Sequence, residues 1–327
     1  MSKPLVLIAR RVFPEVLEYL QAHVDVDYHD ADSPLPAAQL RQRLADKEGA
    51  LTMLSERIDG EVLAAAPRLR VVCNVAVGHN NFDLEAMTRA GVMATNTPGV
   101  LDDATADAAW ALLLASARRI VGADRWVRDG QWRGWRFQDE WLGKDVHHAC
   151  LGIVGMGRIG QAVARRAAGF AMRVIYHNRR RLGAAIEAGC NAQWVDMATL
   201  LAQADFLVLL TPYTEATHHL IGAAELAAMK PDAHLVNIAR GGVVDDAALI
   251  EALQQRRIGA AALDVFENEP ALDERFHALD NVVLTPHVGS STRPTRLAMA
   301  LLAADNLIAA LRGQRPPQLL NPAVYAA

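Results

Sequence analysis

The chain has 327 residues, of which 52% are hydrophobic and 21% are charged, and its net charge is −4 with neutral histidines. This composition excludes a disordered chain, and three cysteines are too few for a disulfide scaffold. The slight acidity gives no general attraction to nucleic acid or to an anionic membrane, and no apolar run approaches the ~18 residues of a membrane span. We expect about two globular domains at ~150 residues each, with reduced thiols and a cytoplasmic location.

The N-terminal segment alternates short apolar runs with helix-like stretches. The expected strands are Leu5–Ala9, Gly49–Leu54 and Val71–Val75, and the expected helices between them include Leu40–Asp46 and Gly60–Ala66. This alternation predicts a small parallel α/β unit. From Leu101 a long amphipathic pattern follows, interrupted at Gly122 and Gly130, and it looks like the connection into a second unit.

Six apolar runs in the second unit predict a doubly wound parallel sheet, whose strands are buried on both faces. They are Leu151–Gly155, Arg173–His177, Phe206–Leu210, Leu235–Ala239, Ala260–Val265 and Val282–Pro286. A helical pattern over residues 295–311 follows, with no strand after it. The economical interpretation is that this helix returns to the first unit. We therefore expect a discontinuous domain of residues 1–98 and 289–327, a dinucleotide-binding domain of residues 99–288, and a hinge and cleft between them.

A glycine-rich loop directly follows the first of these six runs. The sequence LGIVGMGRIG places Gly155, Gly157 and Gly160 in GxGxxG spacing, and Arg158 and Ile159 begin the helical pattern after it. The first glycine permits a tight turn, the second lets the backbone approach a pyrophosphate, and the third lets helix pack on strand. Glycine-rich turns are common, so a purely structural turn is the alternative. The strand–turn–helix context favours dinucleotide binding.

The turn after the second run is basic where an acidic side chain would bind the ribose hydroxyls of NAD. Asn178, Arg179 and Arg180 occupy it, followed by a further arginine and with no carboxylate. Arginines at this position would pair with a 2′-phosphate, which predicts NADP(H), with NAD(H) as the weaker alternative. The competing interpretation is a solvated basic turn. The missing acid also argues against an S-adenosylmethionine enzyme.

Polar residues follow three apolar runs at the edge where ligands of open α/β sheets bind. They are Arg240, Asp264 and His287, and Glu269 lies five residues beyond Asp264. An arginine can bind a substrate carboxylate through two hydrogen bonds and polarise a ketone, and a protonated imidazole can deliver a proton. A carboxylate beside that imidazole would stabilise its charged form. Each residue alone has a structural alternative, but their shared edge favours reduction of a 2-oxo acid.

Four motifs carry a family resemblance over essentially the whole chain. LGIVGMGRIG, MKPDAHLVNIARGGVVDDAALIEAL, GAAALDVFENEP and NVVLTPHVGSST, in this order, resemble the D-isomer-specific 2-hydroxyacid dehydrogenases. Within that family the chain looks most like bacterial glyoxylate/hydroxypyruvate reductases, including those called 2-ketogluconate reductases. The resemblance implies a Rossmann cofactor domain inserted into a flavodoxin-like substrate domain, and a homodimer.

The resemblance also implies roles for individual residues. Arg240, Glu269 and His287 would be the catalytic triad, and the backbone at Val77 and Gly78 would hold the substrate carboxylate together with Arg240 and His287. The remaining implied coenzyme contacts are Thr105 and Asp264 at the nicotinamide carboxamide, Thr211 and Pro212 along the adenosine, and Gly289. His79 departs from the family, which more often has an acidic residue or tyrosine there. We expect Trp132 and Trp135 to serve in packing, with the active site or dimer contact as alternatives.

The expected function is therefore NADPH-dependent reduction of glyoxylate or hydroxypyruvate, with 2-ketogluconate as a further candidate and His287 as proton donor. A phosphoglycerate-type dehydrogenase is the enzymatic alternative, although Arg57 alone offers a basic group for a phosphorylated substrate. A dinucleotide-binding corepressor-like protein is the alternative from another class. The histidine pairs 147–148 and 218–219 lack the i, i+4 spacing of helical metal ligands, so we predict no metal site.

Overall fold

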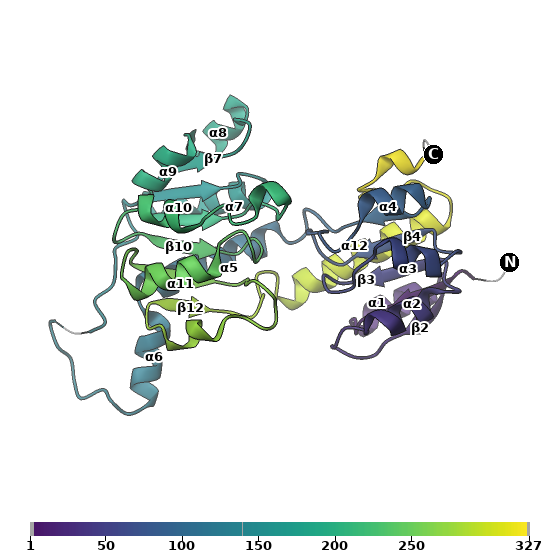
Figure 1. Ribbon diagram of the computed structural model, residues 1–327, viewed down its shortest axis with the longest axis horizontal. Helices are drawn as coiled ribbons and strands as arrows, with labels where there is room; N and C mark the ends of the chain where they lie inside the picture. The colour runs from purple at the N-terminus through teal and green to yellow at the C-terminus, as the bar shows by residue number, and fades with distance from the viewer. Residues whose placement is uncertain (1–2, 139, 326–327) are drawn as a thin grey trace. The chain divides into compact units, whose positions relative to one another are not determined.

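The chain forms two compact units in the computed structural model, which describes residues 3–138 and 140–325 (Figure 1). The first unit extends to Leu101 and resumes at Thr292, and the second is Asp102–Ser291. The limits predicted from the sequence, 98/99 and 288/289, lie a few residues earlier. Both units contain a parallel sheet with helices, which confirms the predicted α/β fold class.

The first unit has a five-stranded parallel sheet in the order β2-β1-β3-β4-β5. The strands are β1 Leu5–Ile8, β2 Asp25–Tyr28, β3 Gly49–Thr52, β4 Val71–Asn74 and β5 Met93–Thr95. The predicted strands match β1, β3 and β4, whose residues are mostly buried. β2 and β5 were not predicted. β2 is an edge strand with two aspartates and no fully buried residue, so it lacks the apolar run by which strands were recognised.

Six helical segments accompany this sheet. They are α1 Pro14–Gln21, α2 Ala37–Leu44, α3 Gly60–Ala65, α4 Leu84–Arg89, α12 Arg293–Leu311 and the 3₁₀ turn Pro322–Tyr325. α12 packs on α1, β3, β4 and β5, so the last long helix does belong to the first unit. In the part of the chain that the structure describes, it is the one helix long and apolar enough to cross a membrane. Half of its apolar window is buried, as in a core helix.

The second unit has a seven-stranded parallel sheet in the order β12-β11-β10-β9-β6-β7-β8. The strands are β6 Cys150–Val154, β7 Arg173–His177, β8 Ala192–Trp194, β9 Phe206–Leu209, β10 His234–Asn237, β11 Ala260–Leu263 and β12 Val282–Leu284. The strand order reverses beside β6, and ligands of doubly wound sheets bind at this switch point. The glycine-rich loop follows β6 and therefore lies there.

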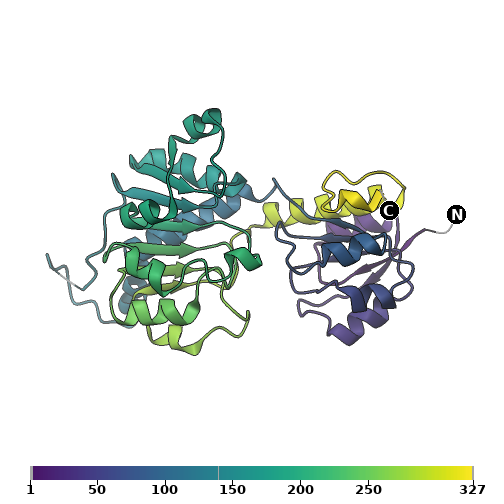
Figure 2. The same cartoon turned by 45° about the horizontal axis from the view of Figure 1, so that its top comes forward.

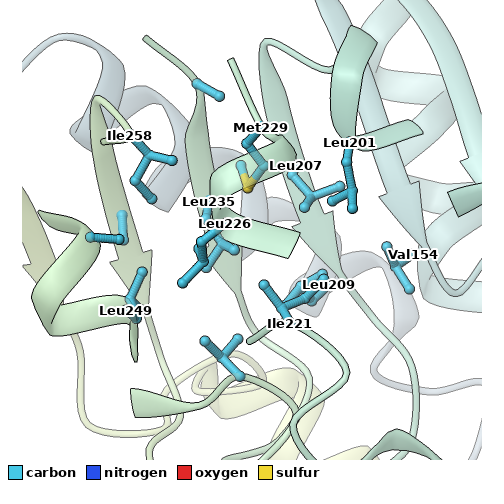
Figure 3. Close-up of a cluster of buried hydrophobic side chains, with 14 of the residues drawn as sticks. Val154, Leu201, Leu207, Leu209, Ile221, Leu226, Met229, Leu235, Leu249 and Ile258 are labelled. Atoms are coloured by element: carbon cyan, nitrogen blue, oxygen red, sulfur yellow. The ribbon is translucent and has the colours of Figure 1, made fainter. Parts of the chain in front are cut away.

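Helices cover both faces of this sheet (Figures 1 and 2). They are α5 Asp102–Ala117, α7 Arg158–Ala167, α8 Ala184–Cys190, α9 Met197–Gln203, α10 Ala223–Ala228 and α11 Asp246–Gln254, with 3₁₀ turns at Ala168–Phe170, Glu215–Thr217 and Glu274–Ala278. α6 Ile120–Arg128 follows α5 and has no buried residue. Alternate residues of β9 face opposite layers: Leu207 and Leu209 join the cluster with α9, α10 and α11 (Figure 3), whereas Phe206 and Val208 join the one with α5 and α7. Burial on both faces explains why these strands are continuous apolar runs.

The long connection after Leu101 differs from its prediction in one respect. The helix breaks at Arg119, which has left-handed backbone at φ 52°, and Gly122 lies inside α6. Gly130, at φ 66°, follows the end of α6 as expected. Trp132 and Trp135 are 57% and 81% exposed, so the expected packing role is wrong within this chain. Cys73, Cys150 and Cys190 are buried free thiols.

Candidate active site

The glycine-rich loop has the backbone geometry that its spacing predicts. Gly155 has φ 98°, and a Cβ there would lie 2.7 Å from the backbone of Leu210 and Thr211. A Cβ at Gly160 would lie 2.4 Å from the carbonyl oxygen of Gly155. Both positions therefore require glycine, one for the turn and one for the close approach of α7 to the loop.

Gly157 is different, because a Cβ there would meet open space. This residue is the N-cap of α7, and no side chain caps the helix. The first-turn N–H groups, which include those of Arg158 and Ile159, therefore face an open site at the positive end of the helix dipole. Room beside Gly157 and uncapped N–H groups are what a bound pyrophosphate requires.

The turn after β7 leaves two of its three arginines unpaired. Asn178 accepts a hydrogen bond from the backbone N–H of Met156 through Oδ1 (2.7 Å), which fixes it against the glycine-rich loop. Arg179 and Arg180 are exposed and make no side-chain hydrogen bond or ion pair with any residue described. Arg181 instead binds Glu187 through two hydrogen bonds of 2.9 and 2.7 Å. The turn thus presents two available guanidinium groups rather than three.

Two of the other predicted coenzyme positions lie after β9. Thr211 is half-buried, Pro212 is exposed, and the Pro212 carbonyl accepts a hydrogen bond from Thr217 Oγ1 (2.8 Å). Leu210 donates its N–H to Val154, so this segment runs beside the end of β6. Thr105 lies in α5 and is 6% exposed.

His287 and Glu269 form a hydrogen-bonded pair. The imidazole Nδ1 lies 2.8 Å from Glu269 Oε2, and the other oxygen of that carboxylate accepts the N–H of Phe266 at 2.9 Å. Burial tends to raise the pKa of Glu269, but the hydrogen bond and charge of His287, the Phe266 N–H and the charge of Arg240 outweigh it and lower the pKa. The carboxylate is therefore ionised beside the imidazole at neutral pH, and Nε2 remains available for substrate.

Asp264 holds the turn that carries His287. Its carboxylate accepts hydrogen bonds from Thr285 Oγ1 (2.6 Å) and from the N–H groups of Val288 and Gly289 (2.8 Å each). His287 has left-handed backbone at φ 54° and donates its N–H to the carbonyl of Asp264 (2.9 Å). Such backbone is unfavourable for a residue with a Cβ, so the bonds to Asp264 offset its cost. A Cβ at Gly289 would lie 3.2 Å from Asp264 Oδ2, which keeps this position small.

Arg240 follows β10, and its charge and that of Glu269 interact. Burial lowers the pKa of its guanidinium and the charge of Glu269 raises it, and an arginine remains charged under either influence. Its side chain donates to the carbonyl of Ala239 at 2.6 Å and to no other residue that the structure describes. Asn237, 1% exposed, donates through Nδ2 to the Arg240 carbonyl (3.2 Å) and fixes the backbone. Most of the guanidinium donors are thus available for a ligand.

Val77 and Gly78 lie in the first unit, in the loop after β4. Both are half-buried, and their carbonyl oxygens accept hydrogen bonds from the side chains of Asn96 and Asn74 (2.8 Å each). His79 follows them, and its Nδ1 is buried without a hydrogen-bond partner among the described residues. The predicted site residues therefore fall into two groups, this loop in one unit and the coenzyme and triad residues in the other.

A family profile decides the identity of the chain. The profile described as "D-isomer specific 2-hydroxyacid dehydrogenase, NAD binding domain" matches residues 110–289, which is more than half of the chain. The chain belongs to the D-isomer-specific 2-hydroxyacid dehydrogenase family. The predicted family resemblance is thereby confirmed, and the second unit of this dehydrogenase is a Rossmann domain that binds NAD(P).

Relatives match the dehydrogenase over almost its entire length. A glyoxylate reductase of Thermococcus onnurineus is 48% identical over 98% of this chain and 96% of its own, and one of Pyrococcus furiosus is equally similar over the same shares. Among solved structures, the TT0316 protein of Thermus thermophilus has a TM-score of 0.91 and 42% identity, covering 97% of this chain and 99% of its own. An NADPH-dependent glyoxylate/hydroxypyruvate reductase of Sinorhizobium meliloti, solved with NADP and malonate, has a TM-score of 0.87 and 32% identity over 98% and 97%.

One group of side chains in the described chain could hold a metal ion, although the sequence predicts none. Ligand atoms of His218, His219 and Glu267 lie within 4.8 Å of one another. His219 Nε2 already lies 2.5 Å from Glu267 Oε1, and the two imidazole rings are stacked, with centroids 3.8 Å apart. His218 Nδ1 lies 3.3 Å from the Tyr213 hydroxyl, so in its present geometry the group consists of a His219–Glu267 pair and a separate His218–Tyr213 contact. Spacing along one helix could not reveal it, because Glu267 comes from a distant strand end.

Sequence reasoning missed the polar residues that support the site. Asn74, Asn96 and Asn237 are 0%, 7% and 1% exposed. Asn74 ends β4 and Asn96 follows β5 in the first unit, and Asn237 ends β10 in the second. The signal that could have revealed them is a polar residue at the carboxyl end of an apolar run.

Proposed function

We propose that this dehydrogenase uses NADPH to reduce small 2-oxo acids, glyoxylate foremost, to 2-hydroxy acids, with the D configuration where the product is chiral. The observation that carries the proposal is the hydrogen-bonded pair of His287 and Glu269. The charge of Arg240, whose guanidinium is available for a ligand, interacts with that of Glu269. An anion-binding arginine and a carboxylate-supported imidazole suit a carboxylate beside a ketone. The glyoxylate reductases of high identity support this substrate class.

In this proposal Arg240 binds the substrate carboxylate and polarises the 2-oxo carbonyl group, and the backbone at Val77 and Gly78 is a further proposed contact of the carboxylate. When bound, a dihydronicotinamide would supply the hydride for the carbonyl carbon. His287 donates the proton to the carbonyl oxygen from Nε2, so one hydride and one proton convert the 2-oxo group to the alcohol. Glu269 keeps the ring oriented through Nδ1 and stabilises its charged form.

The residues around Gly157 fit a dinucleotide, because the open space there and the uncapped α7 leave room and N–H donors for a pyrophosphate. Arg179 and Arg180 would hold the 2′-phosphate of NADPH, and Asn178 would use its Nδ2 for the ribose, since its Oδ1 binds Met156. Thr105, Thr211, Pro212, Asp264 and Gly289 remain the proposed further contacts. NAD(H) is expected to serve less well.

The proposed active form is a homodimer. An apolar surface supports it: Ile120, Val121, Val127, Trp132, Trp135, Phe137 and Leu142 are each between 47% and 81% exposed in the single chain. α6 contributes several of them and has no buried residue. Apolar side chains concentrated in one segment favour an interface between protein chains. Light scattering coupled to size-exclusion chromatography tests this, and a monomeric mass would contradict it.

The deciding experiment measures NADPH oxidation by the purified protein with glyoxylate, hydroxypyruvate and 2-ketogluconate, each compared through kcat/KM. Turnover of glyoxylate with NADPH is expected, and chiral chromatography should find D-glycerate from hydroxypyruvate. Binding of NADPH without turnover of any of the three acids would contradict the proposal and favour a dinucleotide-binding protein without this activity. A phosphorylated substrate is disfavoured, because Arg57 is 81% exposed and pairs with Asp59.

A further inference from the structure

The loop after β4 has three consecutive carbonyl groups that each accept a hydrogen bond. The carbonyl of Val77 accepts a hydrogen bond from Asn96 Nδ2, and the carbonyl of Gly78 accepts one from Asn74 Nδ2, both at 2.8 Å. The preceding carbonyl, that of Ala76, accepts the backbone N–H of Thr97 at 2.9 Å. Three successive peptide units are therefore fixed in orientation by Asn74, Asn96 and Thr97, which lie outside residues 110–289 of the family match.

A trans peptide is planar, so each N–H points opposite to the carbonyl of the preceding residue. Fixing the carbonyls of Ala76, Val77 and Gly78 thus directs the N–H groups of Val77, Gly78 and His79 away from the asparagines. None of these three N–H groups donates to a residue that the structure describes. Successive backbone N–H groups that have no partner in the protein are the donors from which backbone anion sites are built.

The hydrogen-bond network determines which atom of Asn74 faces the loop. Asn81 Nδ2 lies between the carbonyls of Met53 (3.0 Å) and Glu56 (2.9 Å), so that atom must be the amide nitrogen. Its Oδ1 is then the acceptor for Asn74 Nδ2 at 3.1 Å. The same Asn74 Nδ2 carries the second hydrogen that reaches Gly78, so the donor assignment follows from the chain's own contacts.

Burial makes this support rigid. Asn74 and Asn96 are almost fully inaccessible, and an unmade hydrogen bond at such sites is costly. Glu56, 1% exposed, accepts the N–H of Met53 at 2.7 Å and binds Arg10 at 2.6 Å, which ties the neighbouring loop to the end of β1. All of these groups belong to the first unit.

We propose that Asn74 and Asn96 are positioning residues: they aim the backbone N–H groups of the 77–79 loop, which under the proposed function holds the carboxylate of the 2-oxo acid. The inference rests on the proposed function for the identity of the anion, and it adds which side chains hold the binding loop in place. The asparagines do not touch the substrate. They act by holding the two peptides in the binding orientation before the anion arrives.

The test compares Asn96→Ala and Asn74→Ala with a matched control, Asn321→Ala. Asn321 is 5% exposed in the same unit, accepts the N–H of Ala94 and donates to Val92 (2.9 Å each), and does not contact the 76–79 loop. Oxamate, a nonreducible 2-oxo acid analogue, is titrated into the NADPH-loaded enzyme. Kd for NADPH, KM for glyoxylate, kcat and Tm are measured on the same samples.

Asn96→Ala and Asn74→Ala should each raise Kd for oxamate and KM for glyoxylate about tenfold, as expected for weakening one charge-assisted hydrogen bond. Kd for NADPH should be unchanged in both variants. The control should lower Tm while leaving Kd and KM as in the unmodified enzyme. In the unmodified enzyme, oxamate should shift the amide resonances of Gly78 and His79 in NMR spectra. If Asn74→Ala does not fold, Asn96→Ala carries the comparison.

Unchanged Kd and KM in Asn96→Ala would overturn the inference while leaving the proposed function intact, as would equal increases in Asn321→Ala. Failure of the unmodified protein to reduce glyoxylate would instead contradict the proposed function. In that case, oxamate binding that weakens in Asn96→Ala would still support the anion site.

Discussion

His287 Nδ1 and Glu269 Oε2 lie 2.8 Å apart, although the two residues come from different loops of the second unit. The bond leaves Nε2 as the nitrogen of His287 that can reach a substrate. It also means that Glu269 can influence a reaction only through the orientation and charge of the ring. This division of roles can be tested by removing each partner.

His287→Ala is expected to lower kcat about 100- to 10,000-fold for glyoxylate, because general acid catalysis contributes about that factor. NADPH binding should be unchanged, since the His287 side chain is not among the proposed coenzyme contacts. Steady-state kinetics and a fluorescence titration of NADPH measure the two quantities. A variant that retains more than half of the normal kcat would remove His287 from the proton-donor role.

Glu269→Gln should also lower kcat, and the double variant with His287→Ala should be no slower than His287→Ala alone. The physical reason is that a residue acting through the imidazole has nothing to act on once the imidazole is gone. Kinetics of the two single variants and the double variant measure the coupling. Additive losses would assign Glu269 an independent contact with the substrate.

Much of the fold could be predicted, because strands covered on both faces must be apolar. Phe206–Leu209 and Arg173–His177 were recognisable for this reason. Ala192–Trp194 is a three-residue edge strand without a fully buried residue, so it carries no such run. The break at Arg119 was also beyond prediction, because left-handed backbone at an arginine results from tertiary packing rather than from propensity.

The predicted catalytic and coenzyme positions rest on polar residues at strand ends, where topology brings distant segments to one edge. Arg240, Glu269 and His287 could be listed this way, but their mutual geometry could not. The support from Asp264 to the turn of His287 depends on backbone N–H groups, which leave no trace in side-chain patterns. The same holds for the hydrogen bond from Asn96 to Val77.

Arg240→Lys is expected to raise KM for glyoxylate strongly and to lower kcat as well. Lysine keeps the charge but cannot form the paired hydrogen bonds of a planar guanidinium, and the carbonyl group of glyoxylate would be less polarised. Steady-state kinetics at saturating NADPH measure both constants. An unchanged KM would place carboxylate binding on the Gly78 loop alone.

NADPH should be preferred over NADH by roughly 10- to 150-fold in kcat/KM, because a charge-assisted contact with a phosphate contributes about 1.5–3 kcal/mol. The double variant Arg179→Ala, Arg180→Ala should lower kcat/KM for NADPH and leave kcat/KM for NADH nearly unchanged. High salt should narrow the preference, since both arginines are exposed.

Arg256→Ala, Arg257→Ala is the matched control for this coenzyme test, because it removes two adjacent exposed arginine charges after α11 in the same unit. The control should leave kcat/KM for both coenzymes as in the unmodified enzyme. Equal kcat/KM for NADPH and NADH in the unmodified enzyme would mean that Arg179 and Arg180 only solvate the turn.

Asp246 predicts an unusual dependence of stability on pH. It is 5% exposed, and burial together with the charges of Glu267, Asp245 and Asp273 raises the pKa of its carboxyl to about 6, against an ordinary 3.8. Between about pH 4 and 6 the folded state therefore binds more protons than the unfolded state. The resulting stability is present below the unfolded pKa and is lost as pH rises through the folded pKa.

Asp246→Asn should remove this loss, because an amide stays neutral and its oxygen can still accept the N–H of Glu267, now bound at 3.0 Å. Above pH 7 the variant should gain up to about 3 kcal/mol in the free energy of unfolding, since one pKa unit corresponds to ~1.4 kcal/mol. Denaturant unfolding at several pH values between 4 and 8 measures this.

Asp273, whose pKa is lowered to about 2 by Arg275, provides the opposite control: Asp273→Asn should lower stability near neutral pH. A variant at Asp246 that is less stable than the unmodified enzyme at pH 7.5 would show that the carboxylate is stabilised there rather than strained.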